Sequence, residues 1–216
     1  MAERKVLTRT ESQALTREAL LDAGEKLLLK DGYYATSLAA IANEAGRTIG
    51  AVYSNYSSKE ELGLAVLKRR TSDEIASLMS ALVASDDDLD SRLNVIASHW
   101  ISLCKDENMF LLAAEYGVSI TRQPHQRQRT MEVVERTVAA VRALVEDFLP
   151  PDTPLAMHPE LDRTVQTIVA TGFGLATLQA LGTISAEKSA LLLTGSMKMG
   201  LTLLVKSARR TSSSHA

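Results

Sequence analysis

The chain has 216 residues, of which 45% are hydrophobic, 4% aromatic and 23% charged, and its formal net charge is −2. This length suits one large domain or two small ones of a globular protein. No apolar run approaches the ~18 residues that span a bilayer, and the polar start is not followed by the apolar segment of a secretory signal. Cys104 is the single cysteine, which excludes an internal disulfide and favours the cytoplasm.

Abundant Ala and Leu and scarce aromatic residues favour helices over strands. Apolar residues recur at steps of three and four, and no alternating strand pattern or internal repeat interrupts them. The sequence therefore predicts an all-α fold of about nine helices. In chain order, the first three expected helices lie near residues 11–30, 38–45 and 48–54. A long fourth helix opens at about residue 59 and runs through Leu62, Val66 and Leu67, and a fifth runs from the acidic run 86–90 to about residue 104. The last four lie near residues 109–118, 126–148, 159–181 and 186–206.

Short signals mark several helix ends. Gly32 and Gly46 are placed to end the first two helices, and Thr48 to cap the third. Ser58 followed by Glu61 predicts a capping box at the start of the fourth helix.

Two further segments separate helices in the second half of the chain. The acidic run Asp86-Asp87-Asp88-Leu89-Asp90 suits the positive end of the fifth helix and lacks the glycine of a calcium loop. The proline-rich run 150–154 predicts a loop.

The N-terminal segment predicts a helix-turn-helix, because two short helices joined by a glycine-containing turn follow a longer one. Gly46 permits the positive φ of a sharp turn. Thr48 would leave the first amides of the third helix facing a phosphate. Gly50 and Ala51 keep the exposed face small, so that DNA can approach closely.

The residues after Ala51 also suit a DNA contact. Val52 would pack inward, whereas the polar tips of Tyr53, Asn55 and Tyr56 can bond phosphate oxygens. Lys59 stands in the first turn of the next helix, where a cation is unfavourable for the helix dipole. This position indicates a partner outside its own helix.

The stretch "TSLAAIANEAGRTIGAVYSNYSSKEEL" resembles the DNA-binding signature of the TetR family of bacterial transcriptional regulators. The resemblance extends across residues 15–65. The matching positions are Gly32, Thr36, Ser37, Ile41, Ala42, Ala45, Gly46, Gly50, Tyr53, Tyr56, Lys59 and Leu62.

The resemblance implies a homodimer that binds a palindromic operator in double-stranded DNA and responds to a small-molecule inducer. It also implies that the third helix lies in the major groove and that neighbouring side chains bind phosphates. The implied phosphate-binding residues are Thr48, Tyr53, Asn55, Tyr56 and Lys59, with Thr36 or Ser37. The residues implied to face base edges are Ile49, Ala51 and Ser54.

Two positions depart from the usual pattern of the family. Arg47 stands where a small apolar residue is usual, and Ile49 where a polar or basic one is usual. We therefore expect the operator preference of this chain to depend on Arg47 and Ile49, and on DNA shape.

The expected organisation is a DNA-binding domain over residues 1–57, with a disordered arm over 1–10, then a ligand-binding and dimerisation domain over 58–208 and a disordered tail over 209–216. By the resemblance, the last two helices pair with those of a second subunit. Their apolar stripes fit this interface and a monomer core equally well. The stripe residues are Val165, Ile168, Val169, Gly172 and Leu175, then Ala190, Leu193, Met197, Leu201 and Leu204.

Large apolar residues on the middle helices are candidates for the ligand pocket, although ordinary core packing explains them too. The candidates are Trp100, Cys104, Met109, Phe110, Tyr116, Met131 and Phe173. Few charges accompany them, which favours an uncharged, largely apolar inducer. The scattered histidines predict no metal site, no cofactor is expected, and Cys104 is interpreted as a buried thiol rather than a redox sensor.

These observations favour a non-enzymatic, ligand-responsive transcriptional regulator, and they favour a repressor over an activator. Two alternatives stay open: an activator or inducer-independent DNA binder, and a helical enzyme or carrier. The missing acid–base and metal constellations disfavour the last of these.

Overall fold

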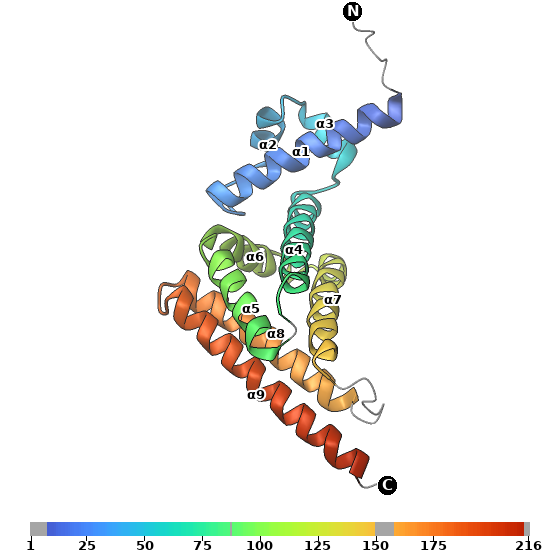
Figure 1. Cartoon of the computed structure of the whole chain (residues 1–216). Helices are drawn as coiled ribbons and strands as arrows, with labels where there is room; N and C mark the ends of the chain where they lie inside the picture. The colour runs from blue at the N-terminus through green and yellow to red at the C-terminus, as the bar shows by residue number, and fades with distance from the viewer. Residues whose placement is uncertain (1–7, 87, 150–157, 214–216) are drawn as a thin grey trace, which may run out of the picture. The chain divides into compact units, whose positions relative to one another are not determined.

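The computed structural model describes residues 8–86, 88–149 and 158–213, in which every regular element is a helix (Figure 1). The helices of these ranges are α1 (Arg9–Asp31), α2 (Leu38–Glu44), α3 (Ile49–Asn55), α4 (Lys59–Val83), α5 (Leu89–Cys104), α6 (Glu107–Ile120), α7 (Pro124–Asp147), α8 (His158–Ala180) and α9 (Ala186–Ser213). The predicted all-α class is thus confirmed. None of these helices combines the length and the apolar character of a membrane span.

Helix α1 begins two residues earlier than expected because Thr8 caps it. The Thr8 hydroxyl accepts a hydrogen bond from the Glu11 amide at 3.2 Å, and the Glu11 carboxylate accepts one from the Thr8 amide at 2.7 Å. This reciprocal pair is a capping box, a signal that our reading of the sequence missed. The helix ends at Gly32, whose φ of 84° belongs to the left-handed region that favours glycine.

The predicted capping box of α4 forms only in part. The Glu61 amide donates to the Ser58 hydroxyl at 3.2 Å, as expected. The Glu61 carboxylate, however, accepts from the amide and the hydroxyl of Ser57, at 2.8 and 2.6 Å. Helix α5 starts as expected, since the Asp88 carboxylate caps it through the Ser91 amide at 2.9 Å.

The helices after α5 are longer than expected at several ends. Pro124 occupies the first position of α7. A backbone N–H at this position has no partner within the helix, so the N–H that proline lacks is not missed. Helix α9 continues to Ser213, past the expected end at residue 206. The expected N-terminal arm before Thr8, the proline-rich run from Pro150 and the end of the tail after Ser213 lie outside the described residues.

Contacts divide the chain into two compact units. The first comprises the chain up to Arg70 together with Leu111–Thr130, and the second comprises Thr71–Phe110 together with the chain from Met131 onwards. This border differs from the expected domain boundary at residue 57, because most of α6 packs with the N-terminal helices. The assignment of residues 1–57 to a separate DNA-binding domain stays a prediction.

In the first unit, α1 packs closely against α2, α3 and the start of α4. Leu20, Ile41, Val52 and Leu62 are fully buried there. Gly24 allows this packing, because a Cβ at this position would lie 2.5 Å from the Leu62 Cδ2. On the outside of the unit, Arg69 of α4 binds three carboxylates of α1. These are Glu18 at 3.0 Å, Asp22 at 2.7 Å and Glu25 at 2.5 Å.

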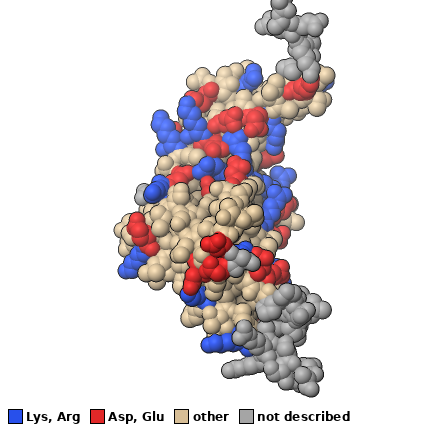
Figure 2. Space-filling view, viewed as in Figure 1, with Lys and Arg blue, Asp and Glu red and all other residues tan. Residues whose placement is uncertain are grey.

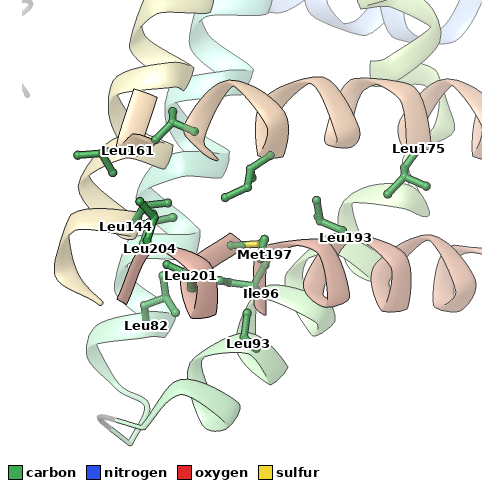
Figure 3. Close-up of a cluster of buried hydrophobic side chains, with 13 residues drawn as sticks. Leu82, Leu93, Ile96, Leu144, Leu161, Leu175, Leu193, Met197, Leu201 and Leu204 are labelled. Carbon is green, nitrogen blue, oxygen red and sulfur yellow. The ribbon is translucent and has the colours of Figure 1, made fainter. Parts of the chain in front are cut away.

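In the second unit, side chains of α8 and α9 form one core with side chains of α4, α5 and α7 (Figure 3). Figure 3 shows Leu193, Met197, Leu201 and Leu204 of α9 pointing into this core. The apolar stripes of the last two helices are therefore mostly buried within the chain. Of the two explanations that the sequence left open for them, the monomer core is correct.

A different face of the same two helices carries apolar side chains at the surface. On α8 and just after it these are Phe173, Leu178 and Leu181, and on α9 they are Leu191, Leu192, Met199 and Leu203, each between 43% and 71% exposed. Figure 2 shows acidic and basic side chains interspersed over the N-terminal helices, and groups of both signs within the uncharged surface of the rest of this face.

Candidate nucleic-acid interface

The turn between α2 and α3 is built around Gly46. Its φ is 61°, its amide donates to the Asn43 carbonyl at 3.0 Å, and the Arg47 amide donates to the Ala42 carbonyl at 2.8 Å. These paired bonds form a Schellman motif, which satisfies the last carbonyls of α2. The motif ends α2 and leads the chain directly into α3, as a helix-turn-helix requires.

Helix α3 has one buried side and one exposed side. Val52 is fully buried and anchors the helix, whereas Ile49 is 44% and Tyr53 is 59% exposed. Thr48 caps the helix by accepting from the Ala51 amide at 3.2 Å, as predicted. Arg47, Gly50 and Ser54 are exposed, and Ala51 is half-buried. The side of α3 that faces solvent is therefore small, apart from Arg47, Ile49 and Tyr53.

Two predicted contacts of α3 are turned back onto their own helix. The Ser54 hydroxyl donates to the Gly50 carbonyl at 2.9 Å, and the side-chain amide of Asn55 donates to the Ala51 carbonyl at 2.8 Å. The Ser54 hydroxyl, which has a single proton, would have to release this bond in order to donate to DNA, whereas the Asn55 side-chain amide keeps a second N–H.

Two residues implied to bind phosphate are buried instead. Thr36 is 4% exposed, and its hydroxyl lies 2.8 Å from the Gly32 carbonyl and 3.2 Å from the Leu27 carbonyl, so that it closes the end of α1. Tyr56 is 1% exposed and packs beneath α1. We correct their expected role from phosphate binding to packing. Ser37, the alternative to Thr36, is exposed and caps α2 through the Ala40 amide at 3.1 Å.

Arg17 of α1 holds the end of α3, which our reading of the sequence missed. Its guanidinium lies 4.2 Å from the centroid of the Tyr56 ring and donates to the Asn55 carbonyl at 2.5 Å. In return, the Tyr56 hydroxyl donates to the Arg17 carbonyl at 3.3 Å. No local pattern could have shown this contact, because the partners are about forty positions apart.

Lys59 is half-buried at the start of α4, with its ammonium 4.5 Å from the centroid of the Tyr33 ring. Burial lowers the pKa of Lys59, and the nearby carboxylates of Glu60 and Glu115 oppose that effect. An aromatic face holds a cation without neutralising it, so the charge of Lys59 remains available to a phosphate.

Three of the seven candidate ligand residues lie together in the second unit. Trp100 and Phe110 are in ring contact at 5.9 Å, and the Trp100 indole donates to Ser189 at 2.8 Å. Cys104 belongs to the same group, because its buried thiol is hydrogen-bonded with Ser189 too. Of the other candidates, Met109 and Tyr116 are buried, and Met131 and Phe173 are 59% and 57% exposed.

A cavity of about 410 Å³ does lie in the second unit, but none of the seven candidates lines it. Its apolar wall is formed by Met79, Leu82, Val83, Ala143 and Leu144, and its polar side by Ser85, Asp86 and the ion pair of Arg92 and Asp147. Among the described residues, no three His, Cys, Asp or Glu side chains gather as a metal site would need.

Comparison with known families finds one matching model, described as bacterial regulatory proteins of the tetR family, at residues 20–66. This match contains α2, α3, the second half of α1 and the start of α4. Two curated relatives match over a similar length. One, 28% identical over 109 residues, is the HTH-type nicotine-responsive transcriptional repressor HdnoR of Paenarthrobacter nicotinovorans. The other, 21% identical over 117 residues, is the fatty acid metabolism regulator protein of Bacillus subtilis strain 168.

These matches cover 50% and 54% of this chain, and the chain spans 56% of the length of each relative. Solved structures match over more of the chain. A TetR transcription regulator from Haloarcula marismortui aligns with 87% of this chain and 97% of its own, at a TM-score of 0.65 and 15% identity. The fatty acid degradation regulator FadR from Bacillus halodurans aligns with 88% and 94%, at a TM-score of 0.58 and 15% identity. At these identities the solved structures show a shared fold.

Proposed function

Because this chain is a member of the tetR family of bacterial regulatory proteins, we propose that it represses transcription by binding a palindromic operator as a two-fold dimer, and that a small molecule releases it. The observation that carries the proposal is α3, which is anchored by Val52 and presents Ile49 and Tyr53 to solvent. A short helix of this kind can enter the major groove with its small side toward the bases.

The proposed DNA contacts are divided between bases and phosphates. Ile49, Gly50 and Ala51 face base edges, Arg47 reaches a base or a phosphate, and Ser54 contributes after releasing its bond to Gly50. Thr48, Tyr53, Asn55, Lys59 and Ser37 bind phosphates from either side of the groove. Thr36 and Tyr56 are left out, because both are buried.

The exposed apolar face of α8 and α9 supports the dimer. Leu191, Met199 and Leu203 are 62% or more exposed on α9, and Phe173 is 57% exposed on α8. Burial of these side chains against a second copy would remove apolar area from water. Gly174 and Gly195 have open space where a Cβ would stand, so helices can approach closely there. The interface thus uses the opposite side of the helices from the stripes that the sequence suggested.

The cavity of the second unit supports a small, largely apolar inducer. Its walls are mostly apolar, and its volume of about 410 Å³ lies within the ~300–1,000 Å³ of small-molecule sites. The inducer acts only if it binds one arrangement of the dimer better than the other. Trp100 and Phe110 form a separate aromatic contact that a bound molecule could also reach after local movement.

Selection of bound duplexes from a random library tests this function. A dimeric repressor selects a palindrome whose half-sites lie about one helical turn, or a multiple of it, apart. Gel shifts at two salt concentrations, with the selected duplex and a scrambled one, measure specificity, since non-specific binding is sequence-blind and falls steeply with salt. Equal affinity for both duplexes would contradict the proposal.

The same experiments separate the alternatives. An activator binds the selected palindrome and raises transcription from a reporter promoter, whereas a repressor lowers it. An inducer-independent binder keeps its operator affinity with every small molecule tested. A carrier or enzyme binds small molecules without selecting DNA. The proposed regulator has no catalytic step, no cofactor and no membrane partner, and it acts in the cytoplasm.

A further inference from the structure

The cavity of the second unit has an apolar side and a charged side. On the apolar side, Leu82 of α4 and Leu144 of α7 are 5% and 7% exposed and belong to the core of the unit. The charged side comes from the turn after α4, the start of α5 and the end of α7. The volume of about 410 Å³ is enough for a small molecule that meets both sides at once.

Negative charge exceeds positive charge in the lining of this cavity. Asp86 and Asp147 contribute two carboxylates, whereas Arg92 is the one cation in the described part of the lining. The Asp147 side chain is 61% exposed, and Asp86 is exposed as well. A carboxylate can accept about four hydrogen bonds, so Asp147 can bind a second donor besides Arg92.

The guanidinium of Arg92 is already engaged on two sides. It donates to the Asp147 carboxylate and lies 4.6 Å from the centroid of the Phe148 ring, and the Arg92 side chain is only 11% exposed. An anion in the cavity would have to compete with these contacts, whereas a cation would meet exposed carboxylates. The charged side therefore favours a cation over an anion.

Basic residues near the lining do not cancel the negative excess, because carboxylates bind them too. The Lys198 ammonium lies 2.5 Å from the carboxylate of Asp90, at the start of α5. Arg142 of α7 binds both Glu146 and Asp162. Each of these cations comes with at least one carboxylate, so the surroundings of the cavity leave its lining negative.

We propose that this cavity binds a small organic amine in its protonated form, with the ammonium group at Asp86 and Asp147. The apolar body of the amine packs against Leu82 and Leu144. This narrows the largely apolar inducer of the proposed function to a cation with an apolar body. The uncharged inducer expected from the sequence was based on seven residues, none of which lines this cavity. Release of DNA by the amine rests on the proposed function, whereas binding of the amine does not.

Benzylamine, benzyl alcohol and methylamine form a matched set of probes. Benzylamine is protonated at neutral pH and carries both a cation and an apolar ring, whereas benzyl alcohol lacks the charge and methylamine lacks the ring. Titration calorimetry on the full chain should show saturable binding of benzylamine and about tenfold weaker binding of each of the other two. The affinity for benzylamine should also fall as salt is added, because salt screens the attraction between charges.

Substitutions in the lining locate the bound amine. Asp86→Asn and Asp147→Asn should each weaken benzylamine binding by about threefold, the usual effect of losing one exposed ion pair. Ala143→Phe should abolish binding, because Ala143 is an exposed residue of the lining and the larger side chain fills the cavity. Asp73→Asn removes an exposed carboxylate of α4 outside the lining and should leave the affinity unchanged. Thermal melting curves check that the variants are folded, and the exposed positions 86 and 143 keep the test valid if Asp147→Asn unfolds.

The proposal is overturned if benzylamine does not bind, if benzyl alcohol or methylamine binds equally well, or if the three substitutions in the lining all leave the affinity unchanged. In a second experiment, benzylammonium chloride should weaken binding to the selected operator more than sodium chloride at equal ionic strength. An equal effect of the two salts overturns the assignment of the amine as inducer. A chain that binds benzylamine but selects no DNA refutes the proposed function and leaves the amine site standing. A chain that selects a palindrome but binds no benzylamine does the reverse.

Discussion

Arg17 and Tyr56 contact each other twice, through a guanidinium 4.2 Å from the ring centroid and through a hydroxyl 3.3 Å from the Arg17 carbonyl. Arg17 also donates to the carbonyl of Asn55, and Asn55 is the last residue of α3. Burial raises the pKa of Tyr56, so its hydroxyl stays a donor at neutral pH. These contacts fix the end of the proposed recognition helix to α1.

The Arg17→Met variant keeps the apolar stem of the side chain and loses the cation and its hydrogen bond. We expect the amides of residues 49–56 to exchange with solvent about tenfold faster or more, because one hydrogen bond from a charged group contributes about 1.5–3 kcal/mol. Hydrogen exchange followed by mass spectrometry measures this change. Lys30→Met, an exposed cation of the same helix, is the control. Equal exchange in both variants would show that Arg17 does not hold α3.

The Tyr53→Phe variant tests the proposed phosphate contact. Because the Tyr53 side chain is 59% exposed, we expect the free energy of unfolding of the variant to be unchanged. Loss of the hydroxyl should weaken binding to every DNA sequence by a similar factor, about tenfold for a hydrogen bond to a charged group. Anisotropy titrations with several duplexes measure this factor, with Tyr34→Phe, a similarly exposed tyrosine, as the control. A loss confined to one operator position would make Tyr53 a base reader.

The Ile49→Ala variant tests where the operator preference resides. Ile49 is 44% exposed on α3 and can meet a thymine methyl group. We expect the variant to lose discrimination at one base pair of each half-site, by about 1 kcal/mol, the lower end for a mismatched pair. Selection experiments on the two proteins measure this change. In Leu15→Ala, which shortens a similarly exposed apolar side chain of α1 outside the proposed interface, the selected sequence should stay the same.

The Met199→Glu variant tests the proposed dimer. Met199 is 64% exposed on α9, so the new carboxylate should leave the isolated chain folded. Between two copies, however, the carboxylate would be buried without a partner, which should prevent the dimer from forming. Sedimentation equilibrium should show a dimer for the natural chain and a monomer for the variant. Leu15→Glu introduces the same charge at a residue of α1 that is 53% exposed, and this variant should remain dimeric. A Met199→Glu protein that stays dimeric would exclude this face.

Cys104 should be chemically inert in the folded protein. Its side chain is 1% exposed, and burial raises the pKa of the thiol, so little reactive thiolate forms at neutral pH. We expect a disulfide reagent to label the chain only after denaturant is added, at one thiol per chain. Labelling as fast as that of a small-molecule thiol, without denaturant, would contradict this expectation and reopen a redox role.

Local signals in the sequence predicted the helices well, since caps and glycines act over three or four residues. Gly46 and Thr48 behave as expected, because a turn and a cap depend on nearby backbone. The same local reasoning could not separate Tyr53 from Tyr56. Both are tyrosines near the end of α3, and only packing under α1 shows that the second is buried.

Periodicity also could not tell a core from an interface. Leu193 and Met197 recur at helical spacing and lie in the core, whereas Leu192 and Met199 lie on another side of the same helix and face solvent. Which side is covered depends on the neighbouring helices, and this is decided by contacts between distant parts of the chain. For the same reason, the sequence could not show that Trp100 and Cys104 would meet at Ser189.

The contacts between Tyr33 and α6 limit how this protein can be recombined. A chimera cut after residue 57, which exchanges only the N-terminal helices for those of another regulator, would separate Tyr33 from Glu115 and Tyr116. The module that can be transplanted is discontinuous, and it includes Leu111–Thr130. Designers of hybrid regulators who carry both segments would keep these contacts intact.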